Sequence, residues 1–333
     1  MTPFSFLRSL GTGIVLLAFS GEVYAQQSFA FNKPVELVVG FAGGTTTDLI
    51  ARILADGLQK QIGQPVLVVN KVGASGMIAS QSIQYGRPDG HAITLTSTVI
   101  ATVQTMKKQP DFDVRRDVIA VTKVLESVVG LFASHDAPFD DVAGMVAYAR
   151  ANPGKVAYGT TGIGTTVHLS TESLAAKAGI SLKFVPYAGS TAALQGLMRN
   201  EIEILINDAA VGLPLVEDKK LKLIAIANSR RAKGLPAIPT IAESGVKELA
   251  DFNLPLWFGM FLSPKTPPDV VELWNKDINE TLRDPEVLKK LALLGYEEQF
   301  IGGTAAPRDF QNFVAQEVDR YSRIVEEAKI EKQ

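Results

Sequence analysis

The sequence predicts an α/β fold built from doubly wound sheets. Short continuous apolar runs alternate with segments whose apolar residues recur at helical spacing. Buried parallel strands separated by crossover helices produce this pattern. The chain has 333 residues, of which 46% are hydrophobic and 20% are charged. That length suggests about two domains, and the apolar fraction suffices for packed cores and excludes a disordered chain.

The predicted elements follow one another in a regular order. Apolar runs predict strands at 35–39, 66–69, 93–96, 156–158, 182–185, 202–206 and 223–227. Helical spacing predicts helices at 49–61, 76–85, 167–178 and 192–200. A further amphipathic segment at 308–329 predicts a surface helix packed on the body of the protein. No low-complexity linker interrupts this order, so we expect strands, not a flexible tether, to join the domains.

The first 25 residues have the three-part pattern of a secretory signal. Arg8 supplies a positive charge, residues 11–20 form an apolar run, and Val23 and Ala25 are small residues suited to cleavage before Gln26. The apolar run is too short for a membrane anchor, which needs roughly 20 residues. We therefore expect a signal peptide at 1–25 and a free, exported protein, most simply a monomer.

Composition excludes several classes of function. The formal net charge is −2, whereas a surface that binds nucleic acid needs clustered Lys and Arg. Three His and no Cys make a metal site unexpected and exclude thiolate chemistry. The sequence also lacks GxSxG and HExxH motifs. We expect no cofactor, no metal and no catalytic residue.

A glycine-rich loop directly follows the first predicted strand and opens the first helix. It reads Gly40-Phe41-Ala42-Gly43-Gly44-Thr45-Thr46-Thr47-Asp48. Glycines let the backbone approach a ligand closely, and a helix N-terminus offers free N–H groups and the positive end of a dipole to an anion. The candidate ligand-binding residues here are Phe41, Gly44, Thr45, Thr46, Thr47 and Asp48. Asp48 is equally compatible with a capping role in the first helical turn.

A second loop of the same build lies about 115 residues further on, between another strand and helix. It reads Tyr158-Gly159-Thr160-Thr161-Gly162-Ile163-Gly164-Thr165-Thr166-Val167-His168. Ligands in open α/β sheets bind outside the carboxyl ends of the strands, so one such loop from each lobe would face a common cleft. The candidates here are Tyr158, Thr161, Gly164, Thr165, Thr166 and His168. For His168 we favour a structural or ligand-orienting role over catalysis.

Three other strand ends supply further candidates. Tyr187 follows the strand at 182–185, and its ring suits a ligand contact and a half-buried core position equally well. Asn207 and Asp208 end the strand at 202–206, and Ser97 ends the strand at 93–96. Trp257 either walls the pocket or fills core, and we favour core.

Several segments, in order, resemble the receptors of tripartite tricarboxylate transporters, also called the Bug family. The family pattern is approximately PFxPGGxTD, ENRPGAGG, PDGYTLL, YGSxGxGSxxH, VPYKGxxPAL, GxVDxMFD and LPDVPTxxE. The corresponding segments here are Gly40 to Asp48, Asn70 to Gly76, Pro88 to His91, Tyr158 to His168, Val185 to Ser190, Glu201 to Asn207, and Leu235 to Glu243. The resemblance runs from about residue 33 to 300.

This resemblance implies a periplasmic-binding-protein-like fold of type II, with two doubly wound α/β lobes, a strand hinge and a ligand cleft between the lobes. Lobe 1 would comprise residues 27–126 plus 229–333, and lobe 2 would comprise residues 127–228. The chain would cross the hinge near 126–130 and 227–230. Family members bind small carboxylates between the lobes, partly through bridging water, and deliver them to a separate membrane permease. The lobes of such receptors close on the ligand by hinge motion.

The sequence departs from the family pattern at the expected ligand site. The prolines before Gly44 are replaced by Ala42 and Gly43, and the Asp that ends GxVDxMFD is replaced by Asn207. A family Asp at that position can receive a ligand ammonium, so its loss weakens the case for an amino acid. Asn207 can donate as well as accept, which suits a carboxylate or a hydroxyl.

The sequence therefore predicts capture of a small carboxylate, either a di- or tricarboxylate or an aromatic one, for delivery to a permease. Neutral donors at Thr45–Thr47 would hold one end, and residues 161–166 would hold the other. One alternative is a receptor that presents its ligand to a membrane sensor kinase. A less favoured alternative is an exported hydrolase that uses Ser97, Ser190 or His168.

Overall fold

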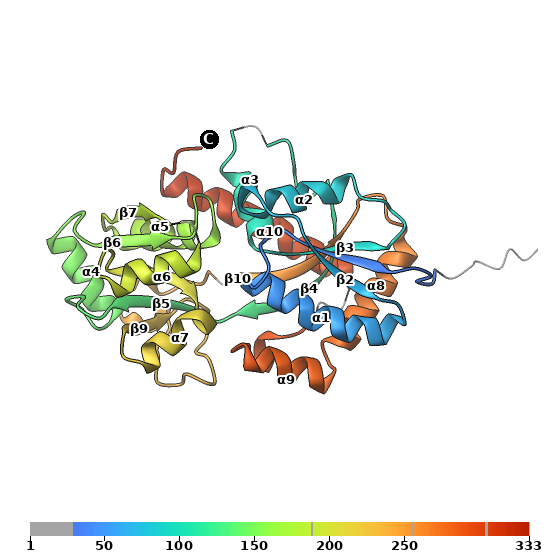
Figure 1. Ribbon diagram of the computed structural model, residues 1–333. Helices are drawn as coiled ribbons and strands as arrows, with labels where there is room; N and C mark the ends of the chain where they lie inside the picture. The colour runs from blue at the N-terminus through green and yellow to red at the C-terminus, as the bar shows by residue number, and fades with distance from the viewer. Residues whose placement is uncertain (1–28, 109, 188, 255, 304–305, 333) are drawn as a thin grey trace, which may run out of the picture.

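The computed structural model describes residues 29–108, 110–187, 189–254, 256–303 and 306–332. The predicted signal at 1–25 lies outside these residues. Two five-stranded sheets form the centres of two lobes that lie side by side (Figure 1). The first sheet has the order β2-β1-β3-β10-β4 and the second the order β7-β6-β8-β5-β9. The predicted α/β class with two lobes is confirmed.

The strands of the first sheet are β1 (Val35–Val39), β2 (Val66–Asn70), β3 (Ala92–Ser97), β4 (Ile119–Ser127) and β10 (Leu256–Leu262). Those of the second are β5 (Val129–Ser134), β6 (Ala157–Thr160), β7 (Lys183–Pro186), β8 (Ile204–Asp208) and β9 (Leu221–Ile226). Strands β1, β2 and β3 pair in parallel, as do β6, β7 and β8. Strands β10 and β5 pair antiparallel with both of their neighbours. The sheets are therefore mixed. The predicted parallel pairing holds for β2-β1-β3 in the first sheet and for β7-β6-β8 in the second.

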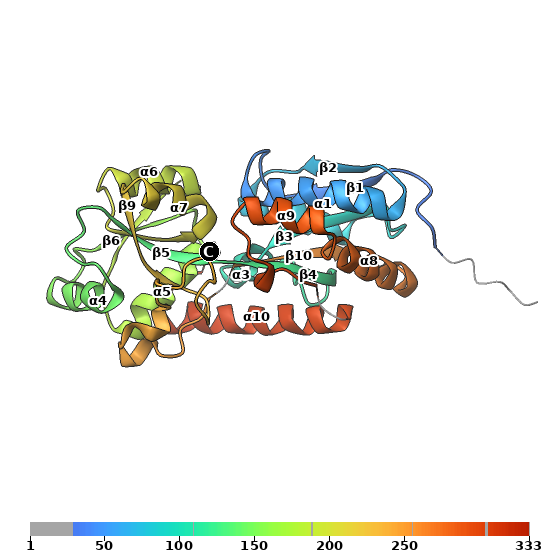
Figure 2. The same ribbon diagram turned by 90° about the horizontal axis from the view of Figure 1, so that it is seen from below.

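The helices enclose both sheets. Those of the first lobe are α1 (Thr46–Ile62), α2 (Met77–Gln84), α3 (Val99–Thr105), α8 (Pro268–Thr281) and α9 (Pro285–Leu293). Those of the second lobe are α4 (Val142–Ala151), α5 (Thr166–Ala178), α6 (Ser190–Met198) and α7 (Ala209–Glu217). Short 3-10 turns occur at η1 (Ala74–Gly76), η2 (Ile241–Ser244), η3 (Lys247–Leu249) and η4 (Glu298–Phe300). The last helix, α10 (Pro307–Glu327), lies against both lobes (Figure 2).

The chain passes directly from one sheet to the other at a single residue, between the end of β4 and the start of β5. Asn228 fixes this crossing, because its side chain accepts from the Val129 N–H at 2.8 Å and donates to the Ser127 carbonyl at 2.9 Å. Asn228 is itself buried at 2% exposure. It follows β9 closely, so it ties the end of this strand of the second sheet to the crossing between the sheets.

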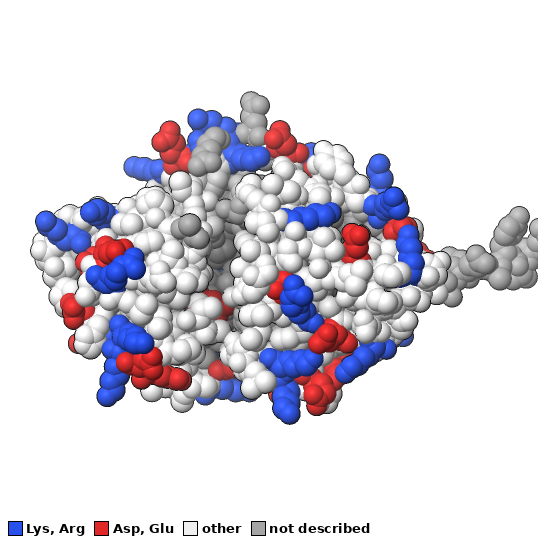
Figure 3. Space-filling view, viewed as in Figure 1, with Lys and Arg blue, Asp and Glu red and all other residues white. Residues whose placement is uncertain are grey.

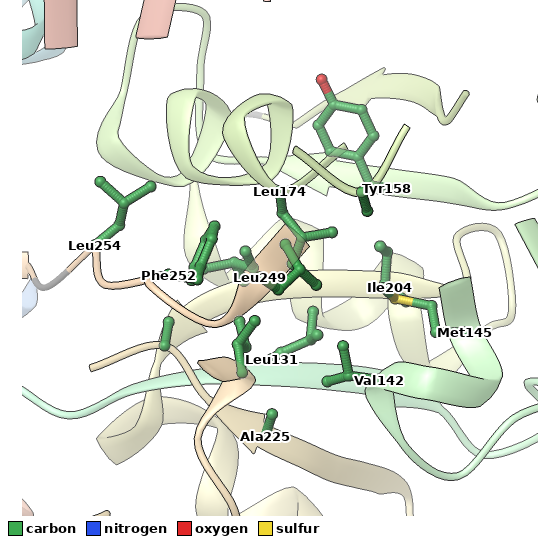
Figure 4. Close-up of a cluster of buried hydrophobic side chains, with 14 of the residues drawn as sticks. Leu131, Val142, Met145, Tyr158, Leu174, Ile204, Ala225, Leu249, Phe252 and Leu254 are labelled. Atoms are coloured by element: carbon green, nitrogen blue, oxygen red, sulfur yellow. The ribbon is translucent and has the colours of Figure 1, made fainter. Parts of the chain in front are cut away.

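Each half of α10 completes a different core. Phe310, Val314 and Val318 pack beside Trp257 in a cluster of the first lobe. Tyr321, Ile324 and Val325 belong to the cluster that fills the second lobe, part of which is drawn in Figure 4. The prediction of a helix packed on the body is confirmed. Trp257 is fully buried and donates from its indole nitrogen to Glu317 at 2.9 Å, which agrees with the core role favoured for it.

The residue limits predicted for the lobes remain a proposal. Four buried residues beyond the predicted second crossing pack in the core of the second lobe, namely Ile241, Leu249, Phe252 and Leu254. Their packing favours a return to the first lobe at about 254–256, later than the 229 expected from the family pattern.

Candidate functional site

The first glycine-rich loop is organised around the carboxylate of Asp48. This side chain is 1% exposed and accepts from the Gly44 N–H at 2.8 Å, from the Asn70 amide at 2.9 Å, and from Arg52 Nε at 2.9 Å. Gly44 adopts a φ of +81°, which favours glycine, and the loop can thereby fold back onto its own helix. The Asn70 amide also donates to the Phe41 carbonyl at 2.8 Å.

These contacts define what Asp48 does. Burial raises the pKa of the Asp48 carboxyl, but hydrogen bonds from Arg52, Asn70 and the Gly44 N–H outweigh burial and hold its pKa below the usual value. The carboxylate is therefore ionised and used within the loop. These contacts agree with the structural role left open for Asp48, and its role towards a ligand stays a prediction. The N–H groups at the start of α1 have no intrahelical acceptor and remain the donors that the loop offers.

The second loop is closed by its own hydroxyls and by His168. Thr165 caps α5: its hydroxyl accepts from the His168 N–H at 3.4 Å and donates to the Gly162 carbonyl at 2.8 Å. The Thr161 hydroxyl lies 3.3 Å from that of Thr165. The Gly164 N–H donates to His168 Nδ1 at 3.1 Å.

His168 therefore has a structural role in this geometry. Burial lowers the pKa of the His168 imidazole, although the nearby Glu172 carboxylate raises it. A neutral ring is consistent with Nδ1 accepting from Gly164, because a protonated nitrogen cannot accept. The ring also packs against Phe184, with the centroids 5.2 Å apart. The favoured non-catalytic interpretation of His168 agrees with these contacts.

Several predicted side chains are engaged within their own lobe. Tyr158 lies in the core cluster of the second lobe, beside Leu174 and Ile204 (Figure 4), and its hydroxyl donates to Glu172. Burial raises the pKa of the Tyr158 hydroxyl. Tyr187 packs its ring over Gly159 and Gly196.

The Tyr187 hydroxyl, Phe41 and Ser97 also contact neighbours within their own lobe. The Tyr187 hydroxyl donates to Glu201 at 3.1 Å, and the Phe41 ring packs on Gly76. Ser97 is 7% exposed and accepts from the Val99 N–H at 3.5 Å. For Tyr187, the equal choice between ligand and core contact resolves in this geometry to packing between β6 and α6.

A cavity in the second lobe, at its boundary with the first, brings together three of the other candidates, Thr166, Asn207 and Asp208. Its lining consists of Val129, Thr166, Val167, Ser170, Ile206, Asn207, Asp208 and Leu256. Figure 3 shows the surface hollowed along the boundary of the two lobes. Thr166, Asn207 and Asp208 come from two loops that the sequence identified, and the fold brings them together at the carboxyl end of β8 and the start of α5.

Three lining residues present buried polar atoms without a hydrogen-bond partner among the described residues: Thr166 Oγ1, Ser170 Oγ and Asn207 Nδ2. All three residues are less than 7% exposed. The other end of the Asn207 amide is occupied, since its Oδ1 accepts from the Asp208 N–H at 2.9 Å and from Ser190 Oγ at 3.2 Å. The Asn207 N–H₂ group is therefore fixed as a donor. An unpaired buried polar group is costly, so these three atoms are the candidates for hydrogen bonds to a bound molecule.

Sequence reasoning missed Ser170 and Tyr296. Ser170 stands four residues after Thr166 on α5, so helical spacing alone places both on one face. Tyr296 carries no local signal in the sequence. Its hydroxyl donates to Asp208 Oδ2 at 3.1 Å.

The described residues contain no group of three or more His, Cys, Asp and Glu side chains placed to hold a metal ion. Among the same residues, no helix has the length and apolar character needed to cross a membrane.

The two-sheet fold and the cavity at the boundary of the lobes are those of a two-lobed solute-binding protein. Residues 50–330 match the model of the tripartite tricarboxylate transporter family receptor, TctC. The chain belongs to this family, which includes the Bug proteins. BugT of Bordetella pertussis is 30% identical over 297 residues, which cover 89% of this chain and 89% of BugT.

Two solved structures extend the similarity. The periplasmic binding protein BugD is 29% identical with a TM-score of 0.78, and the match covers 91% of this chain and 99% of BugD. An R. palustris protein solved with adipate is 28% identical with a TM-score of 0.79, and the match covers 90% of this chain and 98% of that protein. The resemblance inferred from the sequence motifs is confirmed.

Proposed function

We propose that this protein is a periplasmic receptor that binds a small carboxylate between its lobes and delivers it to a membrane permease of the tripartite tricarboxylate type. The observation that carries the proposal is the cavity in which Thr166, Ser170 and Asn207 hold buried polar atoms without a partner. The similar R. palustris protein was solved with adipate, a dicarboxylate, which supports this ligand class. The family membership supports the permease partner and the periplasmic location.

The electrostatics of the cavity fit an anion held by neutral donors. No Lys or Arg is among the lining residues. The first N–H groups of α5 have no acceptor in their own helix, and the positive end of its dipole favours a negative charge. Hydrogen bonds to a charged acceptor contribute about 1.5–3 kcal/mol each. Several such bonds would provide micromolar affinity, about 8 kcal/mol, after the cost of association.

The Asp208 carboxyl is the charged group that faces this cavity. Burial raises its pKa, although hydrogen bonds from Ser127, the Ala210 N–H and Tyr296 lower it.

Titration calorimetry on the full chain tests the ligand class. The panel contains dicarboxylates of four to six carbons, citrate and benzoate, and the matched controls are their uncharged methyl esters. We expect heat from at least one free acid and none from its ester. Equal heat from acid and ester, or no heat from any acid, would contradict a carboxylate site. Recovery of the bound acid unchanged after prolonged incubation separates a receptor from a hydrolase.

A pair of isosteric variants tests the location. Asn207→Asp adds a negative charge where the fixed N–H₂ donor now stands, so we expect affinity for the acid to fall at least about tenfold. Asn312→Asp makes the same change at an exposed position of α10 and should leave affinity unchanged. Equal affinities of the two variants would remove Asn207 from the site. Loss of acid uptake on deletion of the gene, restored by the wild-type gene, tests delivery to a permease.

A further inference from the structure

The segment between α9 and α10 makes an unexpected set of contacts with the second lobe. Gly295 lies against Ala210 at the start of α7: a Cβ built on Gly295 would stand 3.2 Å from the Ala210 Cβ. Gly295 has a φ of +84°, which favours glycine and turns the next residue towards the second lobe. The backbone of the first lobe thus touches the second lobe beside the cavity.

Tyr296 extends this contact into a chain of hydrogen bonds. Its ring is 2% exposed and belongs to the core of the first lobe, so its position is fixed by packing. Its hydroxyl reaches Asp208 Oδ2 of the second lobe at 3.1 Å. Thr46, in the first turn of α1, lies near the Tyr296 hydroxyl and lowers its pKa, which burial and Asp208 raise.

Two neighbouring contacts lie on the same segment. Glu297 accepts from the Lys233 N–H at 2.9 Å and from the Gly234 N–H at 2.7 Å. Arg230 donates to the Gln299 carbonyl at 2.9 Å. The segment from 230 to 235 packs on the second lobe through Ala232. Residues 295–299 therefore line the boundary between the lobes with directional bonds, not with apolar contact alone.

We propose that Tyr296 and Asp208 form a clasp that holds the two lobes together beside the cavity. The Asp208 carboxyl accepts from the Tyr296 hydroxyl of the first lobe at 3.1 Å and from the Ala210 N–H of its own lobe at 3.0 Å. If the lobes separate, the Tyr296 hydroxyl and the Asp208 carboxyl lose each other. Tyr296 is a positioning residue, because it holds the first lobe against Asp208, which lines the cavity.

The separation of the lobes can be measured without any ligand. The sequence has no Cys, so Tyr85→Cys on the first lobe and Asp140→Cys on the second allow specific labelling with a donor and an acceptor dye. Both positions are exposed, at 82% for Tyr85 and 86% for the side chain of Asp140. The clasp predicts lower transfer efficiency in the Tyr296→Phe variant, which keeps the packed ring and removes only the hydroxyl. Asp208→Asn, which retains a helix-capping side chain, should change the efficiency in the same direction.

Tyr321→Phe is the matched control, since it removes another buried phenol hydroxyl that has no partner among the described residues. It should leave the transfer efficiency unchanged. Tyr296→Phe could lower the melting temperature while the transfer efficiency stays at the wild-type value. That result would show that Tyr296 only stabilises the core, and it would overturn the clasp. Unchanged melting temperature and unchanged efficiency would overturn it as well.

The effect on affinity rests on the proposed function and is measured separately. With whichever acid of the panel binds the wild-type protein, we expect Tyr296→Phe to weaken binding about tenfold. If no acid binds the wild-type protein, the proposed function fails, and the dye measurement still decides the clasp. If an acid binds and Tyr296→Phe keeps full affinity, the clasp does not position the cavity for the ligand.

Discussion

The Asp48 carboxylate is the best place to test how the first loop is held. Asp48→Asn keeps the shape of the side chain but replaces one acceptor oxygen with an N–H₂ group. That group must face at least one of the donors that now converge on the carboxylate, namely Gly44 N–H, the Asn70 amide and the Arg52 guanidinium. A donor facing a donor costs about 1–3 kcal/mol. The ion pair with the half-exposed Arg52 adds less than about 1 kcal/mol.

The sum is a loss of about 1–4 kcal/mol at neutral pH. Unfolding entropy is about 2.1 cal/mol/K per residue, so for about 300 residues the melting temperature should fall by about 2–6 °C. Circular dichroism at pH 7, 5 and 3 measures this. Because the folded-state pKa of Asp48 is depressed, its stabilisation is present above the unfolded pKa and is lost as pH falls through the folded value. The difference in melting temperature between the variant and the wild-type protein should therefore be smaller at pH 3.

Asp56→Asn is the matched control on the same helix. Asp56 is 65% exposed and pairs at 2.8 Å with Lys290, which is 44% exposed, so its loss should cost less than about 1 kcal/mol. A loss in Asp48→Asn that is as large at pH 3 as at pH 7 would refute the role of the ionised carboxylate. A loss no greater than that of Asp56→Asn would refute the convergence of donors.

Three further changes probe the cores of the molecule. Burial, together with the nearby Glu280, raises the pKa of Asp277 to about 6. The free-energy cost of its buried charge therefore grows as pH rises from about 4 to 6. Asp277→Asn should stabilise the protein by about 1–3 kcal/mol at pH 8 and not at pH 4, as read from thermal unfolding; equal effects at both values would contradict this. A Cβ on Gly259 would lie 2.2 Å from the Phe310 ring, whereas one on Gly43 would meet nothing closer than 4.0 Å. Gly259→Ala should therefore lower the free energy of unfolding by at least about 1–3 kcal/mol, whereas Gly43→Ala should change it little. Equal urea midpoints for the two variants would contradict this packing. Trp257→Phe removes the indole donor of the buried Glu317 and should cost about 2–4 kcal/mol, while Glu317→Gln, which keeps an acceptor, should cost less.

Local signals in the sequence account for the elements that were predicted well. The apolar run at 35–39 and the glycine-rich loop after it lie close together in the chain, and the structure gives β1 and α1 there. The loop before α5 was found for the same reason, since its glycines, threonines and His168 are all within a few residues of the helix start. In such segments, residues that are close together in the sequence determine the local structure.

The rest depends on contacts between distant segments. Strand β10 enters the first sheet between β3 and β4, with Phe258 paired to Ser97, and no pattern within 256–262 specifies those neighbours. The cavity likewise needs α5 and β8 to meet before Asn207 and Thr166 become neighbours. Tyr296 follows a glycine in a loop and is an ordinary core aromatic by sequence. Its link to Asp208, 88 positions away, exists only once both lobes have folded.

The position of α10 has a consequence for the order of folding. Ribosomes release the chain from its N-terminus, and domains usually fold as soon as their residues have emerged. Here neither lobe has a complete core until 307–327 are available, because one half of this helix supplies Phe310 to the first lobe and the other supplies Tyr321 to the second. A nascent chain that lacks α10 would keep apolar surface exposed in both lobes. Complete folding of either lobe is thereby delayed until α10 has been synthesised, although most of the residues of both lobes precede it.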